Sequence, residues 1–240
     1  MFILLTLVFA GAFLVGSWQL AALYLQGQKQ QRAFDALSAP RADSSGQLTD
    51  SGGASSAPSV FDRYPDMAAW VRVDGTKVDY PVMQTPEKPN YYLRRDLAGA
   101  YSSYGVPYLQ ENCDLDSSDN LIIYGHAFKN GAMFGSLKEY EKQSFWEQHQ
   151  TVVLTTPEEP REYTIFAVFK VDVDAENCFA YWNFTAADEK AYDAFVRQAK
   201  SLSLYDTGIT PAYGQQLLTL STCEYSHANG RLAVLAVRTR

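Results

Sequence analysis

A cysteine and an arginine near the C-terminal end of the chain are the residues best placed to do chemistry. Cys223 ends a mostly apolar and β-branched stretch over 216–222, and Arg231 begins a second such stretch over 231–238. If the two stretches form a hairpin, Cys223 and Arg231 become cross-strand neighbours. A nearby cation favours the nucleophilic thiolate, and arginine offers five donors for an oxyanion. The alternative is that Cys223 is a small buried core residue.

A histidine lies at the end of another predicted strand. His126 follows the apolar run 120–125, and histidine can donate and accept protons near neutral pH. His227 competes for this role because it lies four residues after Cys223. We prefer His126, since a strand end fixes geometry better than a loop does. A surface or capping role is the alternative for His126, and His149, near a predicted helix end, is interpreted as structural.

The other two cysteines lack the surroundings of a reactive thiol. The spacing of Cys113, Cys178 and Cys223 fits no zinc pattern and contains no C-x-x-C motif. Cys113 lies in an acidic loop that would raise its pKa, and Cys178 has no cationic neighbour in the sequence. We therefore predict that both are unreactive.

Short predicted strands with few helices must position these residues. Runs with strand character cover 70–73, 77–82, 121–124, 151–155, 163–173, 216–222 and 231–238. Helices are predicted over 61–70, over 132–149, and from a Thr185-x-x-Asp188 capping pattern to about residue 202. The last helix has an apolar stripe of Ala187, Ala191, Phe195 and Ala199. This pattern predicts a mainly β domain, either a barrel or a sandwich, with helical insertions.

The N-terminal quarter differs in composition from the rest. Residues 1–26 carry no charged side chain and are long enough to span a bilayer as a helix, which predicts a transmembrane anchor. The alternative is a cleaved signal peptide, although the apolar run is long for one and no clear A-x-A site follows it. Residues 27–60, rich in Ser, Gly, Gln and Ala, predict a flexible linker, and residues 61–240 the catalytic domain. The net charge of −7 falls on that domain, which argues against nucleic acid as a partner.

Three motifs in one order resemble the signature segments of sortases, the cysteine transpeptidases of Gram-positive cell surfaces. The run 219–223 matches the T-L-x-T-C strand of that family, with Arg231 at the position of its arginine, and the run 119–126 matches the segment that carries its histidine. The run 131–137, and the Tyr-Tyr-Leu of residues 91–93 after Asn90, resemble class B sortases in particular. The resemblance covers about residues 61–240.

The resemblance implies a closed sortase-type β-barrel with an N-terminal helix and a long helix before the cysteine strand. It also implies a domain on the extracellular face of the cell membrane, although Lys29 and Arg32 after the apolar segment would by themselves favour the cytoplasm. Its catalytic residues would be Cys223, His126 and Arg231. Substrate contacts are predicted at Ser221 and Glu224, which lie beside Cys223, and at Tyr124 and Asn90.

In the implied reaction, Cys223 cleaves a sorting signal near the C-terminus of a secreted surface protein and forms a thioacyl-enzyme. An amine of a peptidoglycan precursor of the lipid II type then takes the acyl group. No metal or cofactor is needed, because the thioester conserves the energy of the bond. Three alternatives stay open: a pilin-polymerising sortase that uses a lysine amine, a cysteine protease that uses water, and a non-catalytic surface binding module.

Overall fold

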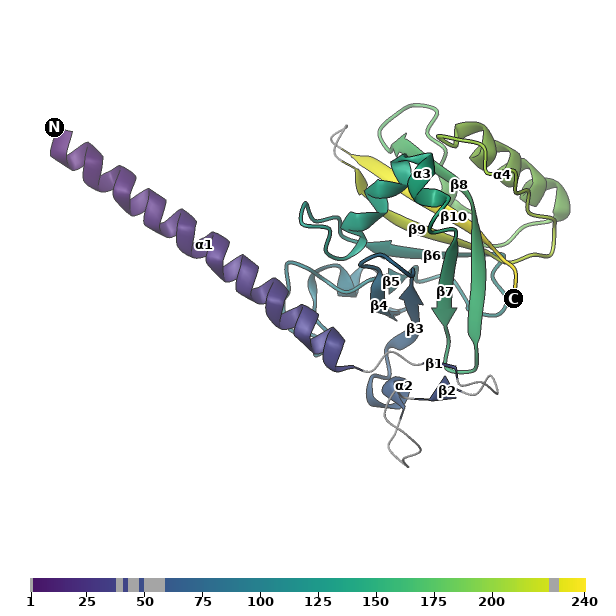
Figure 1. Ribbon diagram of the computed structural model, residues 1–240, viewed down its shortest axis with the longest axis horizontal. Coiled ribbons are helices and arrows are strands. Elements are labelled where there is room, and N and C mark those ends of the chain that lie inside the picture. The colour runs from purple at the N-terminus through teal and green to yellow at the C-terminus, as the bar shows by residue number, and fades with distance from the viewer. Residues whose placement is uncertain (1, 38–40, 43–47, 50–58, 225–228) are drawn as a thin grey trace. The chain divides into compact units, whose positions relative to one another are not determined.

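The computed structural model describes residues 2–37, 41–42, 48–49, 59–224 and 229–240, and the chain separates into two units, Met1–Leu37 and Ser38–Arg240. The first unit contains one long helix, α1 (Phe2–Ala36), which continues past residue 26 into the predicted linker (Figure 1). In the part of the chain that the structure describes, no helix combines the length and the apolar character needed to cross a membrane. The anchor predicted for residues 1–26 is therefore not supported.

The second unit contains a closed β-barrel, in agreement with the predicted fold class (Figure 1). Its strands follow one another around the barrel in the order β10-β8-β7-β3-β4-β5-β6-β9. They are β3 (Met67–Arg72), β4 (Asp79–Met83), β5 (Tyr108–Leu109), β6 (Asn120–Gly125), β7 (Thr151–Thr155), β8 (Pro160–Asp172), β9 (Leu217–Glu224) and β10 (Gly230–Arg238). A separate short ribbon pairs β1 (Arg41–Ala42) with β2 (Leu48–Thr49).

Two neighbouring strand pairs fix the end of the barrel where the candidate residues lie. β6 runs parallel to β9, with Tyr124 opposite Ser221 and Gly125 opposite Thr222. β9 runs antiparallel to β10, with Cys223 opposite Arg231, so the predicted hairpin is confirmed. Strands of this kind, with neighbours on both sides and apolar residues facing the core, are rigid supports. His126 therefore leaves β6 at the end where Cys223 and Arg231 meet.

The helix before the cysteine strand is confirmed as α4 (Glu189–Leu202), although its details differ from the prediction. Its N-cap is Asp188, whose carboxylate accepts a hydrogen bond from the backbone N–H of Ala191 at 2.8 Å. Thr185 lies before this cap, and its backbone carbonyl accepts hydrogen bonds from the N–H groups at the start of β6. The buried face consists of Tyr192, Phe195, Val196 and Ala199, whereas Ala191 is exposed. This face packs on aromatic and aliphatic residues of β8 and β10.

Two other helix predictions are wrong in extent. The helix predicted over 61–70 is only α2 (Val60–Arg63), because Pro65 disfavours helical backbone at the residue before it and β3 follows. The helix predicted over 132–149 is divided into a 3₁₀ segment, η2 (Phe134–Glu141), and α3 (Gln143–Trp146). Lys142 separates these two segments, since its φ of −101° and ψ of 122° are those of extended backbone.

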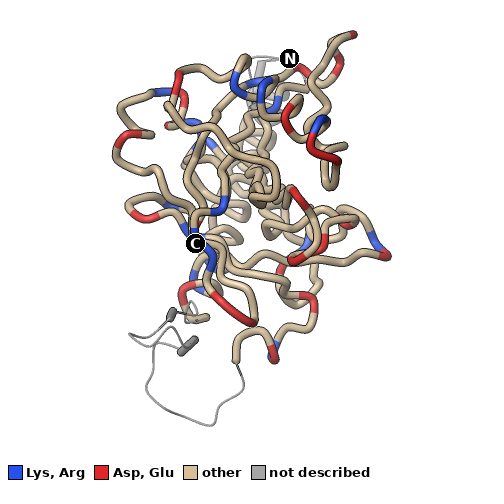
Figure 2. The backbone as a smooth tube through the Cα atoms, turned by 90° about the vertical axis from the view of Figure 1, so that its right-hand side faces the viewer, with Lys and Arg blue, Asp and Glu red and all other residues tan. Residues whose placement is uncertain are grey.

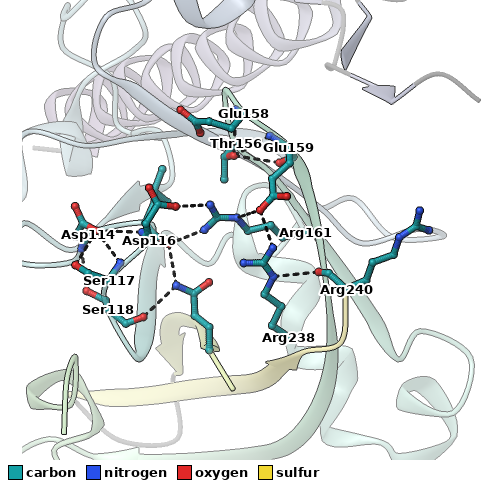
Figure 3. A network of polar contacts seen from close by, with 12 residues as sticks. Asp114, Asp116, Ser117, Ser118, Thr156, Glu158, Glu159, Arg161, Arg238 and Arg240 are labelled. Atoms are coloured by element: carbon teal, nitrogen blue, oxygen red, sulfur yellow. Dashed lines mark hydrogen bonds and ion pairs between the residues drawn. The ribbon is translucent and has the colours of Figure 1, made fainter. Parts of the chain in front are cut away.

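A polar network, shown in Figure 3, fixes the loop 114–118 at the far end of β9 from Cys223. Arg161 of β8 is 3% exposed and donates to the Leu115 carbonyl at 2.6 Å and to Asp116 Oδ1 at 2.5 Å. Its Nε donates to Glu159 at 3.2 Å, and Glu159 also accepts from Arg238 of β10 at 2.7 Å. A buried guanidinium with this many partners stabilises one arrangement of the loop, because any other would leave it unpaired.

Charged residues of both signs are interspersed along the described part of the chain, as Figure 2 shows. Because opposite charges alternate over short distances, their fields largely cancel beyond about 10 Å at ordinary salt concentration. Local contacts therefore decide the electrostatics of the candidate site.

Candidate active site

A cavity of about 400 Å³ opens where β6, β9 and β10 meet, and three of its lining residues are Cys223, His126 and Arg231. The remaining lining residues come from the segment 90–93, from β5 and β6, from the connection after β8, and from β9. They are Asn90, Leu93, Tyr108, Tyr124, Gly125, Val173, Tyr181, Trp182, Ser221 and Thr222. The structure thus brings together the three predicted catalytic residues, which the sequence separates by up to 105 positions (126 to 231).

Cys223 and Arg231 form the β-rich side of the cavity. They are opposite each other in the antiparallel register of β9 and β10. The guanidinium of Arg231 is half-buried, and its Nη1 donates a hydrogen bond of 3.2 Å to the carbonyl of Gly230. Other donors of the planar group remain available for an oxygen in the cavity, since arginine has five N–H groups. A thiol and a permanent cation therefore line the same small volume.

His126 is held by a backbone carbonyl from another part of the chain. Its Nε2 lies 2.8 Å from the carbonyl oxygen of Leu93. A carbonyl oxygen only accepts, so Nε2 carries the hydrogen, and Nδ1 of the neutral ring is the nitrogen that can take up a proton. Burial lowers the pKa of His126 below its ordinary value of 6.5, and the charge of Arg94 lowers it further, although the bond to Leu93 opposes the shift.

The carbonyl of Leu93 is itself positioned by Gly105. Gly105 has a φ of +60°, and a Cβ added to it would lie 2.3 Å from the Leu93 oxygen and 2.8 Å from the Tyr92 oxygen. Both obstacles are backbone atoms, so a side chain would displace the segment that orients His126.

Gly105→Ala is therefore expected to reduce the stability of the fold by about 1–3 kcal/mol and also to lower kcat. The matched control is Gly208→Ala, because Gly208 has a similar φ of +71° and nothing within 4 Å of its added Cβ. The control should lose stability by backbone strain alone and keep kcat. Thermal unfolding and initial rates of peptide cleavage measure the two effects, and an equal kcat in both variants would refute the coupling between Gly105 and His126.

Three of the four predicted substrate-binding residues line the cavity, and each already has a hydrogen-bond partner. The hydroxyl of Ser221, 1% exposed, shares a bond of 2.6 Å with the hydroxyl of Tyr181. Tyr124 donates to Gln110 Oε1 at 2.5 Å, and Asn90 Oδ1 accepts from Tyr108 at 2.7 Å. The backbone of Glu224 pairs with Gly230, whereas its side chain lies outside the described residues.

The hydroxyl of Thr222 fixes the contact between β6 and β9 next to the nucleophile. Thr222 Oγ1 donates to the carbonyl of Gly125 at 2.7 Å. At the other end of the same strand pair, Thr219 Oγ1 donates to Asn120 Oδ1 at 2.9 Å. Gly125 is required because an added Cβ would lie 2.7 Å from the ring of Phe134. These contacts fix the register that places His126 and Cys223 at one end.

Several residues of the cavity were not singled out from the sequence. Tyr181 and Trp182 belong to the 3₁₀ segment η3 (Tyr181–Asn183), and Tyr108 belongs to the short strand β5. The aromatic density of residues 179–184 is the one sequence signal that could have identified η3, since a loop this rich in aromatic side chains must bury them. Nothing comparable marks β5.

The competing histidines and cysteines have other environments. Burial raises the pKa of the Cys113 thiol to about 11, with Glu111 adding a smaller effect, and burial followed by the charge of Asp172 raises the pKa of Cys178. His149 Nδ1 donates a hydrogen bond of 2.9 Å to the Asp74 carbonyl, and the ring packs against Phe145, which agrees with its structural interpretation. His227 lies outside the described residues.

Comparison with known proteins assigns a family. A sortase-domain model matches residues 71–239. Sortase B of Listeria monocytogenes is 26% identical over 236 residues, which cover 96% of this chain and 93% of the relative. Sortase B of Staphylococcus aureus is 27% identical over 175 residues, which cover 71% of this chain and 69% of the relative.

Solved structures give the same result. The crystal structure of sortase B from Bacillus anthracis matches with a TM-score of 0.72 and 26% identity, covering 90% of this chain and 98% of that chain. The structure of a sortase B–substrate complex from Staphylococcus aureus matches with a TM-score of 0.68 and 25% identity, covering 75% and 82%. The barrel, the cavity and the family match agree, and the chain belongs to the sortase family, whose members are cysteine transpeptidases.

Proposed function

We propose that the protein is a class B-like sortase that cleaves a C-terminal sorting signal and joins the new C-terminus to an amine of a peptidoglycan precursor. The observation that supports this most directly is the strand register around the cavity. In this register the thiol of Cys223 lies opposite the permanent cation of Arg231. His126 follows the last residue of β6 at the same end of the barrel. This set of groups suits acyl transfer, which needs a nucleophile, an oxyanion donor and a proton carrier.

In the first half of the proposed reaction, Nδ1 of His126 takes the thiol proton of Cys223, and the thiolate attacks the carbonyl carbon of the scissile peptide bond. Arg231 donates hydrogen bonds to the oxyanion that forms. The C–N bond then breaks, and His126 gives its proton to the leaving amine. A thioester between Cys223 and the substrate remains.

In the second half, the acceptor amine attacks the carbonyl carbon of the thioester. His126, neutral again, takes a proton from the attacking nitrogen, and Arg231 again stabilises the oxyanion. The C–S bond breaks, Cys223 leaves as a thiolate, and His126 returns the proton to its sulfur. A new amide replaces the one that was cleaved, so no external energy source is required. We place this reaction at the outer face of the cell membrane, where peptidoglycan precursors are consumed.

The proposal is tested by mixing the purified full chain with a panel of fluorogenic pentapeptides of the Asn-Pro-x-Thr-Asn and Asn-Pro-x-Thr-Gly type, with and without triglycine. Mass spectrometry should find a triglycine-ligated product and a thioacyl-enzyme. Cleavage without ligation would favour a protease that uses water, or an acceptor such as a pilin lysine. The absence of cleavage and of Cys223 alkylation by iodoacetamide would favour the binding module.

Arg231→Lys tests whether the planar guanidinium matters beyond its charge. Lysine keeps the positive charge but loses the fork of donors, so we expect kcat to fall about a hundredfold while KM changes little. The control is Arg238→Lys on the same strand, because Arg238 bonds to Glu159 at the other end of the barrel. Steady-state rates measure both, and a lysine variant with the wild-type kcat would mean that charge alone is sufficient.

A further inference from the structure

Gln110 has a buried side chain that lies behind the candidate active site and does not line its cavity. It directly follows β5 and is 8% exposed. A buried amide must satisfy its donors and its acceptor, because each one left unpaired destabilises the fold. The partners that satisfy Gln110 lie on two different walls of the cavity.

The backbone at Gln110 is held in place from several directions. Its N–H donates to the Ile122 carbonyl at 2.8 Å, and its carbonyl accepts from Gln84 Nε2 at 3.0 Å and from the Cys113 N–H at 3.0 Å. The loop that follows is fixed further along by the Arg161 network of Figure 3, through the Leu115 carbonyl. The side chain of Gln110 therefore projects from a rigid base.

The two ends of the amide reach in different directions. Its Oε1 accepts the hydroxyl hydrogen of Tyr124 at 2.5 Å, which holds the β6 wall. Its Nε2 donates to the carbonyl of Trp182 at 3.0 Å, which holds the η3 wall, and to Asn112 Oδ1 at 2.6 Å. Both N–H groups and the oxygen are thus used, and Tyr124 and Trp182 both line the cavity.

These bonds are part of a closed circuit around the cavity. Next to Trp182, the hydroxyl of Tyr181 bonds to Ser221 of β9 at 2.6 Å. Ser221 in turn is the register partner of Tyr124. The circuit runs from β6 through Gln110 to η3, from η3 to β9, and from β9 back to β6. Because a closed hydrogen-bonded circuit restrains every member, the distance between η3 and the strands depends on Gln110.

We propose that Gln110 is a positioning residue for substrate binding, which holds the η3 wall against β6 and β9 and so keeps the cleft shaped for an extended peptide. This inference rests on the proposed function in one respect, since it assumes that the cavity takes the peptide substrate. Cys223, His126 and Arg231 are held by strand register and by Leu93, not by Gln110. Loss of the amide should therefore weaken peptide binding and leave the reacting groups in place.

The test is Gln110→Met, which keeps the length of the side chain and removes its polar ends. We expect KM for a cleaved pentapeptide to rise about five- to tenfold while kcat stays within about twofold of wild type. The rate of Cys223 alkylation by iodoacetamide should stay within about twofold as well. Hydrogen–deuterium exchange should become at least about tenfold faster at the amides of Tyr181, Asn183 and Phe184, which donate to carbonyls of residues 179–181 in and just before η3.

The matched control is Gln84→Met, which removes two donor bonds to the same loop, at 3.0 Å to the Gln110 carbonyl and 2.7 Å to the Cys113 carbonyl. Gln84 does not contact η3 in these bonds, so the control should lose thermal stability and keep both KM and η3 exchange. A rise in KM of equal size in both variants would mean general loosening and would overturn the proposal. Unchanged KM and exchange in Gln110→Met would overturn it too.

Two further outcomes remain decisive. If Gln110→Met does not fold, Gln110→Glu replaces it, because a carboxylate still accepts from Tyr124 but cannot donate to the Trp182 carbonyl. The same rise in KM and in η3 exchange is then expected. If the wild-type chain cleaves no peptide, the proposed function fails, and the exchange measurement, which needs no substrate, still decides whether Gln110 holds η3.

Discussion

Cys223→Ala should abolish both peptide cleavage and amide formation, lowering kcat/KM by at least about 10⁴-fold. The alanine side chain carries no nucleophile. Without the thiol no thioester can form, so no acyl group is held for transfer to the amine. The thioacyl-enzyme should also be missing from the mass spectrum of the variant. The thermal unfolding midpoint should change little, since Cys223 is only half-buried and forms no disulfide.

Cys178→Ser is the control for this experiment, because Cys178 is also partly exposed but lies outside the cavity lining. It should keep the wild-type rate. Iodoacetamide at neutral pH should label Cys223 and spare Cys113, since burial raises the pKa of Cys113 to about 11. Persistent turnover by Cys223→Ala would exclude the covalent mechanism.

The meeting of Cys223, Arg231 and His126 in one cavity was predictable from the sequence because short stretches of chain determine their positions. A run of apolar and β-branched residues that ends at Cys223 and a similar run that starts at Arg231 require only hairpin pairing to meet, and the observed register joins them directly. His126 needed a second condition, the parallel pairing of β6 with β9. The spacing of apolar residues along the chain does not predict which strands pair. The resemblance of three motifs to one family predicts this pairing, because the family has a known fold.

The walls of the cavity were less predictable, because their contacts join segments that are distant in sequence. The Leu93 carbonyl reaches His126 across 33 residues, and Gln110 reaches Trp182 across 72. Any residue type can supply a backbone carbonyl, so the sequence does not reveal such a contact. A glutamine in a predicted loop cannot be distinguished by sequence from an exposed polar residue. The sequence also predicted an α-helix where residues 134–141 form a 3₁₀ segment, because a contact between distant parts of the chain decides the backbone there. Gly135 lies so close to the Phe128 backbone, with 2.3 Å from an added Cβ to the Phe128 oxygen, that tertiary packing overrides helix propensity.

His126→Ala should lower kcat about 10³-fold, because the variant has no group to carry the proton between the thiol, the leaving amine and the acceptor. The pH dependence of the wild type should report the same residue. Burial, assisted by the charge of Arg94, lowers the pKa of His126 below 6.5. The neutral ring that accepts the proton of the acceptor amine therefore persists to lower pH, and the acid limb of the ligation rate should fall below pH 6.5.

Arg94→Met tests this explanation, since removing the guanidinium charge should raise the pKa of His126 and move the acid limb to higher pH. Arg95→Met is the matched control, because the Arg95 guanidinium bonds to the Gly99 carbonyl and stacks on Tyr91. Proton NMR of the His126 ring can follow both titrations. A limb that moves equally in the two variants would mean that His126 does not titrate in this step.

The lowered pKa of His126 also makes the stability of the fold depend on pH. The dependence has the opposite sign to that of a histidine paired with a carboxylate, whose pKa is raised. The folded pKa of His126 lies below the unfolded value, so the unfolded chain binds the proton more strongly. The contribution of His126 to stability is therefore complete above the unfolded pKa and is lost progressively as the pH falls from there through the folded pKa. His126→Asn should flatten that part of the stability curve, as measured by thermal unfolding between pH 5 and 8. An unchanged slope would mean that the folded protein binds the proton as well as the unfolded chain does, and the explanation by burial would fail.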